Sequence, residues 1–288
     1  MDLSPRLRQR SWNQFIRSGL RGTTLTPNSK FQLTKWYADC VGHNGDAVIL
    51  YCGIAKWRAI TLRYTSVLEA VSGKQTAARY SLRKSSMPVE QGATIQWQSN
   101  ALGIMGVWER LDPPFETEVY ETSEGVIRWR CLHPRSRATV NIARGKVVKG
   151  LGYVERLDMT LPPWKLPIRE LRWGRFLSDS ESLVWIDWQG SHACRIVLQN
   201  GSLVLATSVG EDEITLNGNS CLRLTGRDAL RKGALGETAL AIIPGLKRLF
   251  PSKILSVQEC KWRSRAELWR ADSKTSGWAI HEVVTWPE

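Results

Sequence analysis

The chain repeats itself, and this repeat constrains its fold more than any other feature of the sequence. A shift of 137 residues places "KWYADCVGHNGDAVILYCG" (35–53) on "RWGRFLSDSESLVWIDWQG" (172–190) without a gap, so that Trp36 meets Trp173. A shift of 127 residues places "GLGYVE" (150–155) on "GWAIHE" (277–282), so that Glu155 meets Glu282. Each unit begins with a Trp-containing segment and ends with a Gly-to-Glu segment. The sequence therefore predicts two units of the same architecture.

Both units consist mainly of short runs rich in β-branched and aromatic residues, such as "GVIRWRCL", "SLVWIDW" and "AIHEVVTW". Gly, Asn, Asp or Pro separates these runs at roughly ten-residue intervals, and many of them alternate apolar with polar residues. This pattern is typical of antiparallel strands in a sandwich or barrel, and it disfavours a βαβ sheet. We predict an all-β protein with two tandem antiparallel β-barrels or sandwiches.

Four segments follow from this reading. Residues 1–29 form a basic N-terminal arm with a short amphipathic helix, residues 30–155 the first barrel, residues 156–170 a linker and residues 171–288 the second barrel. Pro162, Pro163 and Pro167 stiffen the linker, which favours a fixed angle between the barrels. The composition of residues 226–250 predicts a helical insertion in the second barrel, and such an insertion often covers a barrel mouth.

Composition narrows the class of protein further. The chain has 288 residues with 42% hydrophobic and 23% charged residues, as expected for a globular protein, but 14 Trp is unusual and indicates wide cores or an aromatic-lined pocket. The net charge of +13 is concentrated near the N-terminus. It is explained either by a solvated basic surface or by peripheral contact with an anionic membrane. No helix-turn-helix, zinc-finger or RNP pattern accompanies it, so we predict no specific nucleic-acid partner.

The cysteines and the first residues bear on location. Six Cys lie far apart without CxxC spacing, which predicts free thiols in a reducing compartment. The first twenty residues lack the continuous apolar stretch of a signal peptide. We therefore expect a cytoplasmic protein, and the oligomeric state stays open.

Common catalytic motifs are missing from the sequence, which has no GxSxG, GxxxxGK[ST], GxGxxG or HExxH and only four His. What remains is a set of ionisable groups within apolar strands: Glu155, Asp187, His281 and Glu282. Each such carboxyl either faces solvent or an Arg, or faces inward, where burial raises its pKa towards the range of a general acid. Arg175 is a further candidate, because the 137-residue shift places Ala38 opposite it and so gives it no basic counterpart.

The combination of Gly152, Tyr153 and Glu155 with Trp173 and Gly174, in two tandem units, resembles the lipocalin-like superfamily of carotenoid 1,2-hydratase, tocopherol cyclase and the lipocalin-like Diels-Alderases. In those enzymes the acid and the Trp-Gly pair lie only a few residues apart, whereas "RLDMTLPPWKLPIRELR" separates them here. The resemblance implies a large apolar cavity near the meeting of the barrels. It also implies chemistry without a cofactor or metal on a polyene, isoprenoid or polyketide-like molecule.

Three functions stay open at this stage. The first is a hydratase, cyclase or isomerase that acts by alkene protonation or by templated pericyclic cyclisation, and the second is a non-catalytic carrier of a lipid or isoprenoid. The third is a binder of nucleic acid or of a membrane surface that uses the basic N-terminal third, with an affinity that falls steeply with salt. For the enzyme, the predicted catalytic residues are Glu155, Asp187 and Arg175, with Glu155 or Asp187 as proton donor. The predicted substrate-binding residues are Tyr153, Trp173, Trp185, Trp188, His281 and Glu282.

Overall fold

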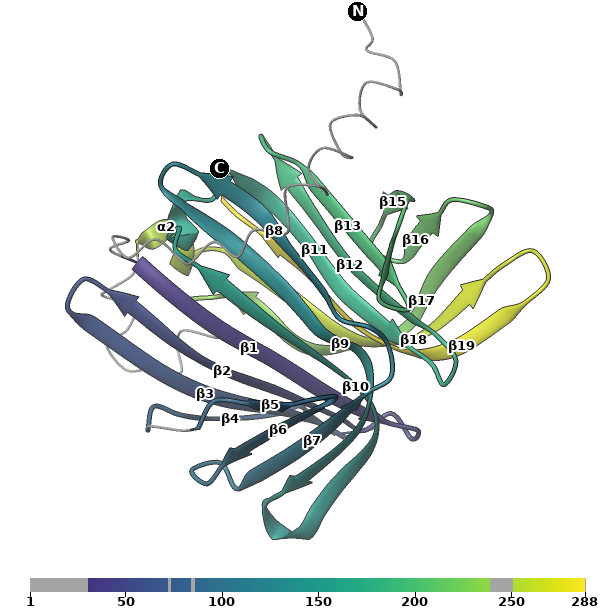
Figure 1. The fold of residues 1–288 in the computed structure, drawn as a ribbon, viewed down its shortest axis with the longest axis horizontal. Helices are drawn as coiled ribbons and strands as arrows, with labels where there is room; N and C mark the ends of the chain where they lie inside the picture. The colour runs from purple at the N-terminus through teal and green to yellow at the C-terminus, as the bar shows by residue number, and fades with distance from the viewer. Residues whose placement is uncertain (1–30, 72–73, 84–85, 239–250, 288) are drawn as a thin grey trace, which may run out of the picture.

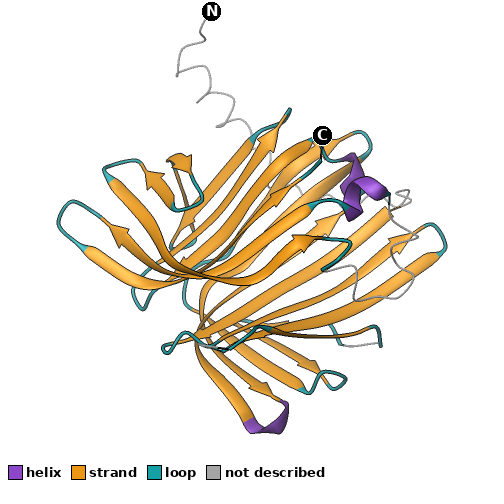
Figure 2. Cartoon of the chain, turned by 180° about the vertical axis from the view of Figure 1, so that it is seen from behind, coloured by secondary structure: helices purple, strands orange, loops and turns teal. Residues whose placement is uncertain are grey.

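The computed structural model describes residues 31–71, 74–83, 86–238 and 251–287. The predicted N-terminal arm and its helix lie outside the described residues. Almost all of the described chain is strand, arranged as two antiparallel sheets (Figures 1 and 2).

The first sheet has ten strands in the order β4-β3-β2-β1-β10-β9-β7-β6-β5, and β8 pairs with β9. Its strands are β1 (Phe31–Gly42), β2 (Ala47–Trp57), β3 (Ile60–Ala70), β4 (Ala77–Ser81), β5 (Val89–Gln91), β6 (Thr94–Ser99), β7 (Ile104–Arg110), β8 (Phe115–Thr122), β9 (Gly125–Ile142) and β10 (Lys146–Met159).

The second sheet has nine strands in the order β14-β13-β12-β11-β19-β18-β17-β16-β15. Its strands are β11 (Ile168–Leu177), β12 (Ser182–Gly190), β13 (Cys194–Gln199), β14 (Ser202–Val204), β15 (Ala206–Val209), β16 (Glu213–Leu216), β17 (Ser220–Ala234), β18 (Gln258–Trp269) and β19 (Lys274–Thr285). The order matches that of the first sheet strand for strand, with β1 corresponding to β11 and β10 to β19. The predicted duplication is therefore present in the topology.

The register of the sheets corrects the predicted alignment by one residue. Glu155 lies opposite Tyr37, and Glu282 lies opposite Trp173. Because the two glutamates correspond, Trp173 is the counterpart of Tyr37 (173 − 37 = 136) and not of Trp36. A slip of one residue exchanges the faces of a strand, so Trp36 packs inside the first barrel while Trp173 faces the other sheet.

Strand alternation divides the core into layers. One cluster, which includes Trp36 and Trp108, fills the interior of the first barrel, and a second, which includes Phe176 and Trp185, fills the interior of the other. A third cluster lies between the sheets and contains Tyr37, Tyr153 and Trp173, among others. The central strands are buried on both faces, which explains why runs such as "AVILYC" are almost continuously apolar.

Helix is scarce in the described chain, and the predicted helical insertion is wrong where the structure describes it. Residues 226–234 continue strand β17, residues 239–250 lie outside the described residues, and α2 (Ser252–Leu255) is a single turn. Register shifts near Thr225 and Ala229 let β17 keep its pairing with β18 despite the extra residues. Pairing between strands has thus overridden a helical composition. The other helical turns are the 3-10 segments Ala143–Gly145 and Pro163–Lys165.

The connection between the sheets is shorter than the predicted linker. Residues 156–159 complete β10 and Ile168 begins β11, so only residues 160–167 connect the two strands. The three prolines all lie in this connection.

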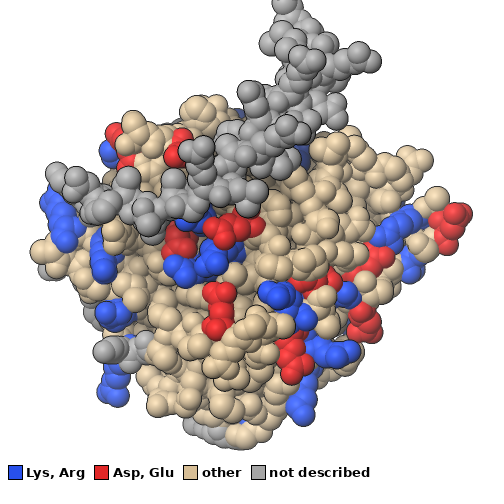
Figure 3. Space-filling model, in the orientation of Figure 1, with Lys and Arg blue, Asp and Glu red and all other residues tan. Residues whose placement is uncertain are grey.

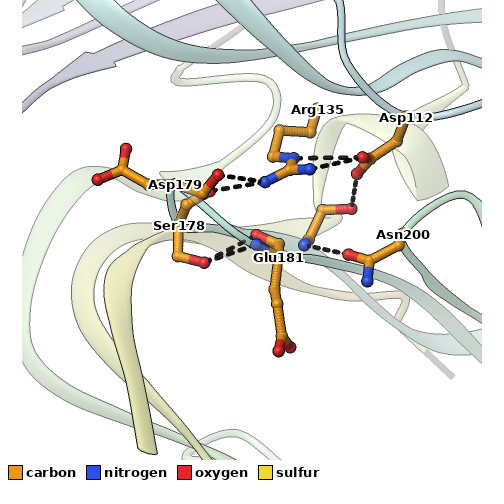
Figure 4. A network of polar contacts seen from close by, with 7 residues as sticks. Asp112, Arg135, Ser178, Asp179, Glu181 and Asn200 are labelled. Atoms are coloured by element: carbon orange, nitrogen blue, oxygen red, sulfur yellow. Dashed lines mark hydrogen bonds and ion pairs between the residues drawn. The ribbon is translucent and has the colours of Figure 1, made fainter.

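A polar cluster also holds the two sheets together far from the connection (Figure 4). Arg135 of β9 donates to Asp112 (2.8 Å) and to the main-chain oxygen of Asp179 (2.6 Å), and Ser182 of β12 donates to Asp112 (2.5 Å). Arg135 and Asp112 belong to the first sheet's half of the chain, whereas Asp179 and Ser182 belong to the second. This network therefore joins the two halves of the chain through side-chain contacts.

Charged side chains of both signs are interspersed on the face shown in Figure 3, much of which is neither acidic nor basic. Among the described residues, no helix is long and apolar enough to cross a membrane.

Candidate functional site

A cavity of about 370 Å³ lies between the two sheets, beside the connection and α2. This volume falls in the range of small-molecule sites. Its walls are mainly apolar and come from both halves of the chain: Phe31, Leu33, Ala55, Leu62, Tyr64, Thr65, Ser66, Tyr80, Leu82, Pro163, Leu171, Leu235, Ile254, Val257, Val284 and Trp286. The cavity lies where the resemblance implied one, at the meeting of the two barrels.

Four charged residues and one tyrosine gather at one end of this cavity, which we call the polar end: Lys35, Arg231, Glu259, Glu282 and Tyr51. Arg231 forms an ion pair with Glu259 (2.8 Å), and the same guanidinium donates to the hydroxyl of Tyr51 (3.3 Å). Strand alternation brings these side chains together, since they come from β1, β2, β17, β18 and β19 with their side chains facing the gap between the sheets.

Glu282 is held as a carboxylate by Lys261, with which it forms an ion pair. Burial opposes ionisation of Glu282, but the positive charges of Lys261 and Lys35 outweigh it and lower the pKa of Glu282. Lys261 is itself 1% exposed. Burial alone would lower the pKa of this ammonium, yet Glu282, Tyr51 and Glu259 together outweigh burial, and the pKa of Lys261 is raised.

Lys261 is also enclosed by aromatic rings. Its ammonium lies 5.1 Å from the ring centre of Trp173, 5.6 Å from that of Tyr37 and 5.9 Å from that of Tyr51. Ring faces attract a cation, so this cage adds to the stability of the charged form. Trp173, predicted to bind substrate, thus holds a lysine beside the cavity.

Glu155 is half-buried between the sheets and is not among the cavity-lining residues. Its Oε2 accepts hydrogen bonds from Tyr153 Oη (2.7 Å), Trp129 Nε1 (2.7 Å) and Trp173 Nε1 (3.2 Å). Burial raises the pKa of Glu155 above its ordinary value, although these three donors and the charge of Lys35 oppose the shift. Within the described chain, no hydrogen bond to Oε1 is found, so this oxygen is the one that can carry a proton.

Glu155 and Glu282 occupy corresponding positions, yet their neighbours differ. Across the sheet Glu155 faces Cys131 of β9, whereas Glu282 faces Lys261 of β18. A thiol supplies no positive charge, and burial raises the pKa of Cys131 as well. One copy of the duplicated acid is therefore ionised and the other is biased towards its protonated form.

Arg175 forms a buried ion pair with Asp39, its counterpart in the first sheet. Its Nη2 lies 2.8 Å from Asp39 Oδ1 and its Nε 3.0 Å from Oδ2, while Nη1 donates to the main-chain oxygen of Trp278 (2.9 Å). Both side chains are fully buried. Arg175 therefore joins the two sheets. The 137-residue shift placed Ala38 opposite Arg175, whereas its counterpart and ion-pair partner is the next residue, Asp39.

Three predicted residues lie inside the second barrel rather than at the cavity. Asp187 is ion-paired with Arg195 (2.7 Å), and Trp185 packs against Gly174, where a Cβ atom would lie 2.2 Å from its ring. Nε2 of His281 lies 2.9 Å from Ser264 Oγ, and burial, with nearby Arg227, lowers the pKa of His281 to about 3.

Trp188 faces the gap between the sheets, on the opposite face of its strand from Asp187, but it belongs to a different cluster. It packs with Phe31, Ile127, Met159 and Ile168, and its ring centre is 5.5 Å from that of Tyr120. Of the predicted residues, Glu282 lines the cavity, and Trp173, Tyr153 and Glu155 form the layer beneath it.

The sequence reading missed Lys35, Tyr37, Tyr51, Arg231 and Lys261. Lys35 and Tyr37 alternate along "KWYAD", which was a visible sign that one face of this strand is polar and aromatic. Lys261 stands in "CKWRSR", where alternation alone did not show that a lysine faced inward.

Among the described residues, no three His, Cys, Asp or Glu side chains come together in a way that could hold a metal ion. All six cysteines are free.

Comparisons with known proteins locate the fold. No protein-family model and no curated protein sequence matches the chain. The solved structure of CghA with Sch210972 matches with a TM-score of 0.54 at 11% identity, covering 92% of this chain and 94% of that one. A putative AttH from Nitrosomonas europaea matches with a TM-score of 0.54 at 9% identity (92% and 98%), and kievitone hydratase from Nectria haematococca with 0.52 at 8% (93% and 95%).

These likenesses span nearly the full length of each chain and include both sheets. At such low identity they show the fold and nothing finer. The chain has the tandem lipocalin-like fold that its sequence predicted, and this part of the prediction is confirmed.

Proposed function

We propose that the protein binds a hydrophobic, unsaturated small molecule of isoprenoid, polyene or polyketide type in the cavity between the sheets and converts it by hydration, cyclisation or isomerisation. Glu155 is the proposed proton donor. In favour of catalysis, two proteins of this fold are a hydratase and a Diels-Alderase. Because their sequence identity to this chain is low, the reaction is inferred from the residues of the site.

The observation that carries the proposal is the difference between the two corresponding glutamates. Alkene protonation needs a neutral carboxylic acid in a dry setting, because an ionised carboxylate has no proton to give. Glu282 is ionised by Lys261, whereas burial raises the pKa of Glu155. Glu155 Oε1 is free to carry the proton while Oε2 is fixed by three donors, which hold the carboxyl in one orientation.

The proposed step moves a proton from Glu155 Oε1 to one alkene carbon, and the π electrons form the new C–H bond. Because Glu155 does not line the cavity, this step requires the alkene to extend past the lining residues and reach Glu155. The adjacent carbon becomes cationic. It is captured by water, which then loses a proton to the Glu155 carboxylate, or by another π bond of the substrate, and the new cationic centre then loses a proton from a neighbouring carbon to the same carboxylate. Aromatic rings near the site, such as Tyr37 and Trp173, stabilise a cation through their faces, as they already do for Lys261. Asp187 and Arg175 have no part in this mechanism, since each is engaged in an ion pair elsewhere.

The test begins with the substrate. The purified protein is extracted with organic solvent and the extract analysed by mass spectrometry for co-purified apolar molecules. The molecules found, together with a panel of polyenes, are then incubated with the protein in D₂O. Protonation by an exchangeable acid predicts a product with one deuterium on carbon per turnover.

The informative variant is Glu155→Gln, which keeps the size of the side chain and removes the acid. We expect it to retain binding and to lose turnover by at least about 100-fold, the lower end of what one general acid contributes. Glu69→Gln is the control, because Glu69 pairs with Arg79 (2.7 Å) at the edge of the first sheet and should leave turnover unchanged. A product without deuterium, formed equally by Glu155→Gln, would replace the acid mechanism by templated pericyclisation.

The second candidate is a non-catalytic carrier of the same class of ligand. One observation favours it: of the two carboxyls that line the cavity, Glu282 is ionised and Glu259 pairs with Arg231, and Glu155 does not line the cavity. A ligand that is extracted unchanged and stays unchanged on incubation supports the carrier and rejects the enzyme.

A further inference from the structure

We propose that the ligand of this cavity carries one acidic group, such as a carboxylate, which pairs with Lys35 while the apolar part fills the rest of the cavity. This inference rests on the proposed function, because it takes the cavity between the sheets as the binding site. It adds the chemical class of the ligand and its orientation.

Lys35 is placed to meet such a group. It lies on β1 after Phe31 and Leu33, and these three alternating residues line the cavity in turn. Its ammonium lies 5.2 Å from the ring centre of Tyr51, at the polar end, and the side chain is half-buried. Within the described part of the chain, Lys35 has no ion pair and no hydrogen bond.

The other cations in or beside the polar end already have partners. Lys261 pairs with Glu282, and Arg231 pairs with Glu259 at 2.8 Å. Three positive groups thus meet two carboxylates, and Lys35 is the positive charge left over. Glu155 does not supply the missing anion by direct contact, since its described hydrogen bonds come from Trp129, Tyr153 and Trp173, and burial biases it towards the neutral form.

A cation without a counter-ion beside an apolar wall is costly to desolvate when a neutral chain fills the cavity. A carboxylate removes that cost and gains a charge-assisted hydrogen bond, one of the stronger polar contacts in proteins. The same cavity therefore discriminates between an acid and an alcohol of equal length. The apolar walls fix the rest of the ligand, with its far end towards Ile254, Val257 and Trp286 or towards Leu62 and Leu82.

The test uses cis-parinaric acid, a fluorescent polyene carboxylate, and the corresponding alcohol. Each is titrated at pH 8 into the full-length protein and into Lys35→Met, Lys35→Arg and Lys149→Met. Lys149 is an exposed lysine of β10 and serves as the control. We expect the wild-type protein to bind the acid at least tenfold more tightly than the alcohol. Lys35→Met should lose this preference by weakening acid binding alone, while Lys35→Arg and Lys149→Met should keep it.

Each outcome decides one question. Equal affinities for acid and alcohol in the wild-type protein overturn the role of Lys35 and leave the cavity as a site for neutral ligands. A preference that persists in Lys35→Met also overturns it. If neither probe binds to the wild-type protein, the cavity is not the site, and the proposed function fails together with this inference. The wild-type ratio is measured without any variant, so it does not depend on whether Lys35→Met folds.

Discussion

Replacing Arg175 with Met should destabilise the protein more than any surface substitution, because it breaks an ion pair that is buried between the sheets. Arg175 and Asp39 each have 0% of their side-chain surface exposed. Removing the guanidinium leaves the Asp39 carboxylate with the hydroxyl of Tyr37, 2.9 Å from Oδ2, as its only side-chain partner among the described residues. Loss of one partner of a buried pair typically costs about 3–5 kcal/mol in the free energy of unfolding.

The double variant Asp39→Leu/Arg175→Met separates the charge from the packing. It removes the uncompensated carboxylate, so it should recover part of the loss seen in Arg175→Met. It still leaves the Tyr37 hydroxyl and the main-chain oxygen of Trp278 without their partners, at about 1–3 kcal/mol each. We expect a coupling energy between the two positions of about 2 kcal/mol or more.

The assay is urea unfolding followed by tryptophan fluorescence and by circular dichroism, with the two transitions compared. Arg223→Met is the control, because Arg223 also pairs with a carboxylate, that of Glu213 (3.1 Å), but with 57% and 45% of the side chains exposed. Such an exposed pair contributes less than about 1 kcal/mol. If Arg175→Met costs no more than Arg223→Met, the pair is not dry and the reasoning about the contact between the sheets is refuted.

Three further predictions concern the packing and the ionisable groups. Gly174→Ala should cost about 1–3 kcal/mol in urea unfolding, since its Cβ atom would lie 2.2 Å from the Trp185 ring; a loss below about 0.5 kcal/mol would contradict this. Burial lowers the pKa of His281 to about 3, whereas an unfolded His titrates near 6.5, so the unfolded chain binds the extra proton between these values. The contribution of the neutral His281 to the free energy of unfolding is complete above pH 6.5 and is lost as the pH falls towards 3. In His281→Gln this free energy should therefore fall less between pH 6.5 and pH 4 than in the wild-type protein. A carboxylate bound at Lys35 should raise the pKa of Glu155 further, because it offsets the positive charge that now lowers it. Titration calorimetry of cis-parinaric acid in buffers of different ionisation heat should then show proton uptake that disappears in Glu155→Gln, and equal uptake in both proteins would count against the coupling.

The duplicated all-β architecture could be predicted from the sequence because it depends on local patterns. Strand alternation, turn residues and the repeated Gly-to-Glu segment each act within a few residues. The one-residue error in aligning Trp36 with Trp173 came from matching residue types, which does not detect which face of a strand a side chain occupies. That error hid the correspondence of Asp39 and Arg175.

The site was less predictable because its residues come from strands far apart in the chain. Tyr51 and Arg231 are separated by 180 positions and meet only when the two sheets pack together. The helical prediction for residues 226–250 failed for a related reason: the strand Ser220–Ala234 is stabilised by pairing with β18, a contact that composition does not encode. Glu155 and Glu282 were found because they lie in the repeat itself.

The duplication also suggests why the proposed acid is single. A repeated sheet brings two equivalent glutamates to the gap between the barrels, where burial opposes the ionisation of each. Lys261 resolves this in the second copy by pairing with Glu282, and Trp173, the residue that corresponds to Tyr37, both encloses Lys261 and donates to Glu155. The Trp173 ring thus contacts both Lys261, the partner of the ionised Glu282, and Glu155, the glutamate that can be protonated. Replacing Cys131 with Lys would place a lysine opposite Glu155, as Lys261 lies opposite Glu282. We infer that the first copy must lack a positive charge at this position in order to deliver a proton.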